Sequence, residues 1–151
     1  MSDTVSRKTR SRMMAGIRGQ HTQPELLVRK LLHERGFRYR LHRKDLPGTP
    51  DIVLPKYTAV IQVHGCFWHG HNCRLFKLPG TRTQWWAEKL EGNRARDERN
   101  TSELVRRGWR VLVVWECALE HKGGLPMGDL AETLQQWLRS RIRTYEITGD
   151  Q

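Results

Sequence analysis

The sequence lacks long hydrophobic runs. Among its 151 residues, the longest apolar run extends only from Val111 to Trp115. A membrane-spanning helix needs about 20 apolar residues, so this run predicts a core strand. Residues 1–20 are charged and polar, without the apolar stretch that a signal peptide requires. We therefore expect a cytoplasmic protein.

Cysteine and acidic residues are also scarce. Three cysteines are an odd number, which argues against a closed disulfide framework and favours reduced thiols that can bind a metal. Only 16 Asp and Glu stand against 27 Lys and Arg, a formal net charge of +11. This balance favours a polyanionic partner, and nucleic acid first. A membrane surface is less favoured, because no basic amphipathic helix has a broad apolar face.

The order of the expected elements indicates one domain over residues 1–151, without repeats or linkers. A helix is expected to open at Thr22, with a capping-box spacing to Glu25, and to end at Gly36. The order α-β-β-β-α-β-α predicts an α/β sandwich with a mixed central sheet. The remaining expected elements are a basic arm or helix at 1–20, strands at 37–41, 51–54, 59–63 and 111–115, a long helix at 83–107, and a last helix from Asp129 over 130–143.

The first chemical motif lies on the predicted hairpin. Asp51 opens one strand and Gln62-Val63-His64 closes the next, so pairing should bring Asp51 close to position 63. Restriction-endonuclease-like nucleases place Pro-Asp and then Asp/Glu-x-Lys in this way, although Gln62 and His64 replace the acid and the lysine. Asp51 and the carbonyl oxygen of Val63 offer the oxygen ligands that Mg²⁺ prefers for phosphodiester cleavage. Asp51 alone could equally mark an ordinary turn.

Other residues can supply a second acid and a general base. Glu25 is the natural second acid, or only part of the capping box with Thr22. His64 and His69 suit acid–base work near neutral pH, and His69 is our choice for the base. Asp97 could orient that base, or form a salt bridge with Arg94 or Arg99. The spacing of the long helix places Asp97 on one face with five other residues, namely Trp86, Leu90, Asn93, Thr101 and Leu104.

A cysteine- and histidine-rich segment predicts a zinc site. Cys66, His71 and Cys73 lie within eight residues, and the distant Cys117 can complete a tetrahedral set. Three thiols that pack as small hydrophobic groups are the alternative.

Aromatic residues in and beside this segment suit contacts with DNA bases. Phe67, Trp68, Trp85 and Trp86 lie among Arg74, Lys77, Arg82 and Lys89. Such residues can stack on bases or wedge between base pairs. A tryptophan is also commonly a core residue.

Together these motifs resemble the very short patch repair (Vsr) endonucleases over roughly residues 8 to 120. The Cys-Phe-Trp-His and Trp-Glu-Cys-Ala segments are the most specific parts of the resemblance. The matching segments are Thr9–Ser11, Leu46–Asp51, His64–Cys73, Thr81–Thr83, Glu88–Lys89 and Gly108–Leu119. The one departure we identify is Val63, where a threonine is usual, and a backbone carbonyl ligand survives that change.

The resemblance implies a restriction-endonuclease-like α/β/α sandwich with a mixed central sheet and a zinc-stabilised loop. It implies Mg²⁺-dependent nicking 5′ to the thymine of a T·G mismatch, which arises when 5-methylcytosine deaminates. The implied partners are mismatched double-stranded DNA and other mismatch-repair proteins. The implied protein is a monomer that associates with the bacterial nucleoid while it acts. The implied sites are Asp51 and the Val63 carbonyl for Mg²⁺, His69 as base with Asp97, Glu25 and His64 in support, Cys66, His71, Cys73 and Cys117 for Zn²⁺, and Phe67, Trp68 and Trp86 inserted into the DNA. The alternatives are a restriction-type nuclease with another target and a non-catalytic zinc-containing DNA-binding module.

Overall fold

A computed structural model of the chain describes residues 21–120 and 123–149. The arm expected at residues 1–20 lies outside the described residues. No helix in the described part of the chain is both long and apolar enough to cross a membrane.

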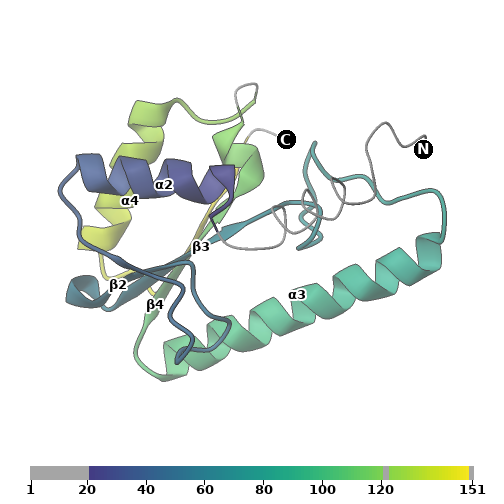
Figure 1. Cartoon of the computed structure of the whole chain (residues 1–151), viewed down its shortest axis with the longest axis horizontal. Coiled ribbons are helices and arrows are strands. Elements are labelled where there is room, and N and C mark those ends of the chain that lie inside the picture. Colours follow the sequence, from purple (N-terminus) through teal and green to yellow (C-terminus); the bar gives the residue numbers. More distant parts are fainter. Residues whose placement is uncertain (1–20, 121–122, 150–151) are drawn as a thin grey trace.

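The centre of the protein is one five-stranded mixed sheet (Figure 1). The strands follow each other in space as they do in sequence, antiparallel from β1 to β3 and parallel from β3 to β5. They are β1 (Arg40–Leu41), β2 (Ile52–Leu54), β3 (Ala59–His64), β4 (Arg110–Trp115) and β5 (Thr144–Ile147). Short 3₁₀ turns follow β2 at Pro55–Tyr57 and β4 at Glu116–Leu119.

Helices cover both faces of this sheet (Figure 1). Helices α2 (Gln23–Glu34) and α4 (Met127–Arg139) lie on one face, and α3 (Thr83–Arg106) lies on the other. Side chains alternate along the strands, as the pleat requires: Ile61 and Leu112 join the core under α2 and α4, while Val60 and Val111 pack with Leu104 of α3. The expected three-layer α/β sandwich with a mixed sheet is therefore confirmed.

The long helix has the face that its spacing predicts. Leu90 and Leu104 are buried, and Trp86, Asn93, Asp97 and Thr101 are half-buried. This face of α3 lies toward the sheet and the loop after β3, so the Asp97 side chain points inward.

The C-terminal part corrects the prediction of a helix over 130–143. Helix α4 ends at Arg139, and the residues after it form β5, which was not expected. The hydroxyl of Ser140 donates to the Trp137 carbonyl at 2.7 Å and accepts from the Ile142 N–H at 3.2 Å, which turns the chain out of the helix. Three of the four β5 residues are exposed, so the strand carries no apolar alternation that sequence could reveal.

Candidate active site

The predicted catalytic residues gather at the end of the sheet where β3 finishes. They come from four places in the chain: the first turn of α2, the β2–β3 hairpin, the loop after β3 and the middle of α3. All of them line one cavity of about 810 Å³: Glu25, Asp51, Val63, His64, His69 and Asp97.

Asp51 is held by the neighbouring strand. Its Oδ2 accepts a hydrogen bond of 2.8 Å from the Val63 N–H, so the hairpin brings Asp51 to position 63 as predicted. Its own N–H donates a long hydrogen bond of 3.4 Å to the Gln62 side chain. Burial raises the pKa of Asp51 to about 6, partly offset by the Val63 N–H, and the nearby charge of Glu25 raises it further. A cation at this carboxylate would relieve that cost.

Glu25 belongs both to the helix cap and to the site. Its N–H donates to the Thr22 hydroxyl at 3.3 Å, which forms one half of the expected capping box. Its carboxylate is only 2% exposed and lies 2.9 and 3.0 Å from Nε2 of His42, with Arg29 at 3.2 Å. Glu25 therefore takes part in the helix cap and also lines the cavity that holds Asp51, and its role as the second acid stays a prediction.

His69 and Asp97 form a close pair. Nδ1 of His69 lies 2.5 Å from Oδ2 of Asp97, which leaves Nε2 as the ring atom able to accept a proton. Of the two arginines proposed as alternatives for Asp97, Arg94 contacts Glu91 and the Gly70 carbonyl. The geometry therefore fits a histidine oriented by a carboxylate.

His64 stacks directly on His69. The two ring centroids are 3.8 Å apart and the planes differ by 3°. Burial lowers the pKa of His64 to about 3, and the neighbouring His69 lowers it further. His64 is therefore neutral at physiological pH and offers an uncharged imidazole beside the base.

The predicted metal ligands form a second cluster behind this cavity. The ligand atoms of Cys66, His71, Cys73 and Cys117 all lie within 4.8 Å of one another. Nδ1 of His71 is 3.5 Å from Sγ of Cys66 and 3.7 Å from Sγ of Cys117. Burial raises the pKa of the Cys66 and Cys117 thiols and lowers that of His71. A bound cation would stabilise the thiolates, and three sulfurs with one neutral imidazole suit a soft tetrahedral metal.

The C-terminal tail covers this cluster of cysteines and His71. The Gly149 N–H donates to Sγ of Cys117 at 3.3 Å, while Arg74 donates to the Cys117 carbonyl at 3.2 Å. On the other side, the Glu116 carboxylate accepts from the Cys66 N–H at 3.1 Å. The cluster therefore joins the loop after β3, the end of β4 and the tail after β5.

Comparison with known proteins identifies the family. The family described as DNA mismatch endonuclease Vsr matches residues 2–75. Type II nicking enzyme V.XorIIP of Xanthomonas oryzae pv. oryzae is 54% identical over 125 residues, which cover 83% of this chain and 92% of that protein. The chain belongs to the Vsr family. DNA mismatch endonuclease Vsr of Escherichia coli is 45% identical over 138 residues, covering 91% of this chain and 88% of that protein. Type II nicking enzyme V.NmeAIP of Neisseria meningitidis serogroup A is 47% identical over 122 residues, covering 81% of this chain and 87% of that protein.

As a Vsr family member the protein is an endonuclease, and its cavity holds one residue that the motifs missed. His42 follows the two-residue strand β1, and its N–H donates to the Asp51 carbonyl at 3.1 Å while its ring contacts Glu25. Its φ of 48° lies in the left-handed region, and its ring reaches Glu25 of α2. The only signal in the sequence is a histidine directly after a strand that pairs with the Asp51 segment.

The three aromatic residues predicted to enter DNA form one cluster in this Vsr family member. The ring centroids of Phe67 lie 5.0 Å from Trp68 and 5.4 Å from Trp86. Trp68 is only 8% exposed, whereas Trp85 is 43% exposed under the guanidinium of Arg82. Trp68 is thus a core residue in the free protein, which was the alternative to DNA contact that the sequence left open.

Proposed function

We propose that this protein nicks duplex DNA on the 5′ side of the thymine in a T·G mismatch left by deamination of 5-methylcytosine, as a step of very short patch repair. The observation that carries the proposal is the pairing of His69 with Asp97 in the same cavity as Asp51. A base, its orienting carboxylate and a metal-binding acid are the parts that hydrolysis of a phosphodiester requires.

The donor set beside Asp51 fits Mg²⁺. Asp51 bears a pKa raised by burial and by the charge of Glu25, so a hard cation would stabilise its ionised form. We assign the Asp51 carboxylate and the Val63 carbonyl oxygen as its protein ligands. When bound, Mg²⁺ offsets the charge that develops on the scissile phosphate and orients the attacking water.

The residues of the chain move the proton. His69 accepts a proton from the attacking water at Nε2, while Asp97 holds Nδ1–H and stabilises the imidazolium that forms. His64 stays neutral and fixes the plane of His69 by stacking. Glu25, held by His42 and Arg29, supports the metal side of the cavity.

We assign Zn²⁺ to Cys66, His71, Cys73 and Cys117 in a structural role. The cluster lies away from the Asp51 carboxylate, and its four ligands would complete a tetrahedral shell without an open position for substrate. Such an ion contributes to folding because it links the loop after β3 to the sheet.

Phe67, Trp68 and Trp86 are the residues that we propose to enter the DNA beside the mismatch. Their cluster supports this role, because aromatic rings that meet edge-on or tilted beside the cavity can exchange contacts with one another for contacts with bases. Trp68 must leave its buried position to do so. We further propose that the enzyme acts as a monomer in the cytoplasm, on nucleoid DNA, with other mismatch-repair proteins as further partners.

The test is a cleavage assay with the zinc-loaded protein, Mg²⁺ and an end-labelled duplex that carries one T·G mismatch in a CT(A/T)GG context. The fully paired duplex and the Asp51→Ala variant are the controls. We expect cleavage of the mismatched duplex by the parent protein alone. Tight binding without cleavage across a panel of contexts would refute the proposal and favour a non-catalytic module.

A further inference from the structure

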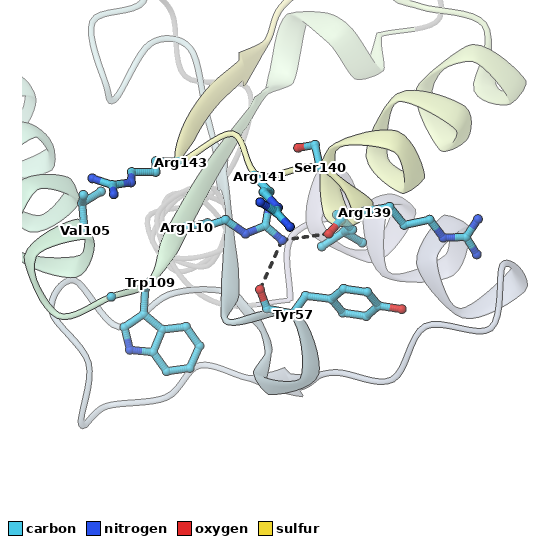
Figure 2. Close-up of a pocket in the computed structure, with 10 residues that line it drawn as sticks. Tyr57, Val105, Trp109, Arg110, Arg139, Ser140, Arg141 and Arg143 are labelled. Atoms are coloured by element: carbon cyan, nitrogen blue, oxygen red, sulfur yellow. Dashed lines mark hydrogen bonds between the residues drawn. The ribbon is translucent and has the colours of Figure 1, made fainter.

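A second cavity, of about 690 Å³, opens at the opposite end of the sheet (Figure 2). It lies between the turn after β2, the α3–β4 connection and the segment that joins α4 to β5. Arg110 begins β4 at this end, whereas Trp115 pairs with the catalytic His64 at the other. Five residues along a strand span about 17 Å. This cavity is therefore separate from the active site.

Arg110 places a fixed positive charge in the wall of this second cavity. The guanidinium donates to four main-chain carbonyl oxygens, among them that of Tyr57 (Figure 2). It also lies 4.6 Å from the ring centroid of Trp137. Burial lowers its pKa, so the folded protein holds this charge at a cost. The four carbonyl oxygens belong to Tyr57, Trp137, Leu138 and Ile142, at 2.8 to 3.4 Å.

Three further arginines line the same cavity: Arg139, which is the last residue of α4, and then Arg141 and Arg143. Arg141 and Arg143 are exposed and belong to the segment between α4 and β5. In residues 21–120 and 123–149, no carboxylate lies within 4.0 Å of the guanidinium groups of Arg110, Arg141 or Arg143. Figure 2 shows the Arg141 side chain beside Arg110, whereas the side chains of Arg139 and Arg143 point away from it. An anion between Arg110 and Arg141 would offset their like charges.

We propose that this cavity binds a backbone phosphate of a second DNA segment while the active site holds the first. Every cation in its lining is an arginine. Arg110 donates through both terminal nitrogens to main-chain carbonyls and so contributes only its charge, whereas the planar fork of the exposed Arg141 can meet two phosphate oxygens with parallel hydrogen bonds. Because the cavity faces the opposite end of the sheet from the catalytic residues, a duplex in the active site leaves it open. A protein that holds two segments can pass from one to the other during its search for a mismatch.

The experiment uses the zinc-loaded full chain without Mg²⁺, saturated with a short mismatched duplex. A labelled, fully paired duplex is then added, and its binding is followed by fluorescence anisotropy across a range of salt concentrations. We expect the parent to bind this second duplex. Arg141→Gln should weaken that binding and reduce the slope of log K against log salt by about 1, the value of one phosphate contact.

Arg139→Gln is the matched control, because it removes the same charge from the adjoining end of α4, where the side chain points away from Arg110. We expect it to keep the slope of the parent. Arg141→Gln should also keep the parent's cleavage of a short mismatched duplex, since Arg141 lies outside the active site.

Three results would overturn the proposal: no binding of a second duplex by the parent, equal losses in Arg139→Gln and Arg141→Gln, or displacement of the labelled duplex by inorganic phosphate or polyglutamate as effectively as by DNA. The last result would assign the cavity to a free anion or an acidic peptide. A parent that never cleaves mismatched DNA would refute the proposed function instead, and the anisotropy measurement would still decide this proposal.

Discussion

Asp51→Asn should make the protein more stable while it abolishes cleavage. The buried carboxylate has a pKa of about 6 in the folded protein, against an ordinary value of 3.8. Ionising it at neutral pH therefore costs the folded state about 3 kcal/mol, at 1.36 kcal/mol for each pH unit. Asparagine removes the charge and keeps an oxygen that can accept from the Val63 N–H.

The sign of the pH dependence follows from the two pKa values. Between pH 3.8 and about 6 the folded state holds a proton that the unfolded state has released, so stability falls as the pH rises through this window. The free energy of unfolding of Asp51→Asn should exceed that of the parent by about 3 kcal/mol at pH 7.5 and by about half of that at pH 5.

Urea denaturation of both proteins, zinc-loaded and without Mg²⁺, measures this advantage at the two pH values. In thermal unfolding it corresponds to a rise of about 6 to 12 °C in Tm for a chain of this length. Added Mg²⁺ should stabilise the parent and leave the variant unchanged, because only the parent offers the carboxylate. Equal free energies of unfolding at pH 7.5, or a gap that does not shrink at pH 5, would refute the reasoning.

The remaining predictions concern the base and the metal cluster. His69→Ala and Asp97→Asn should each lower kcat by about 10²- to 10⁴-fold with little change in mismatched-duplex binding without Mg²⁺; a comparable loss of binding would argue against a base and its orienter. Cys73→Ser should lower the free energy of unfolding and release zinc, and a Tm equal to that of the parent would contradict a structural zinc. Gly149→Ala should weaken zinc affinity about tenfold in a chelator competition, because a Cβ there would lie 2.2 Å from a carbonyl oxygen of the cluster. Gly128→Ala, with open space around its Cβ, is the control and should keep the parent's affinity.

Part of the candidate active site could be predicted from the sequence because Asp51, Val63 and Asp97 lie on or directly beside regular elements. Hairpin pairing follows from the two apolar runs that flank Pro55, and it carries Asp51 to Val63. Helical spacing places Asp97 on an inward face, where it meets His69. The spacing of apolar residues and the residues that form turns are thus enough to predict contacts within a hairpin or along one helix face.

Contacts between distant segments were harder to predict. His42 meets Glu25 only because β1, a strand of two residues without a pattern of its own, pairs with β2. Strand β5 is likewise fixed by its partner β4 rather than by its own mostly exposed residues. The burial of Trp68 depends on how the loop after β3 folds against α3, where Asn93 donates to its carbonyl at 2.9 Å. In each case the local sequence does not determine the structure of the segment, because contacts with distant parts of the chain do.

The most direct test of the central claim maps the nick itself. A duplex with one T·G mismatch, labelled on both strands, is incubated with the zinc-loaded protein and Mg²⁺, and the products are resolved on a denaturing gel. We predict a single break on the strand that carries the thymine, immediately 5′ to it, and none in the paired duplex. Breaks on both strands of the paired duplex would contradict it and assign the protein to the restriction-type nucleases.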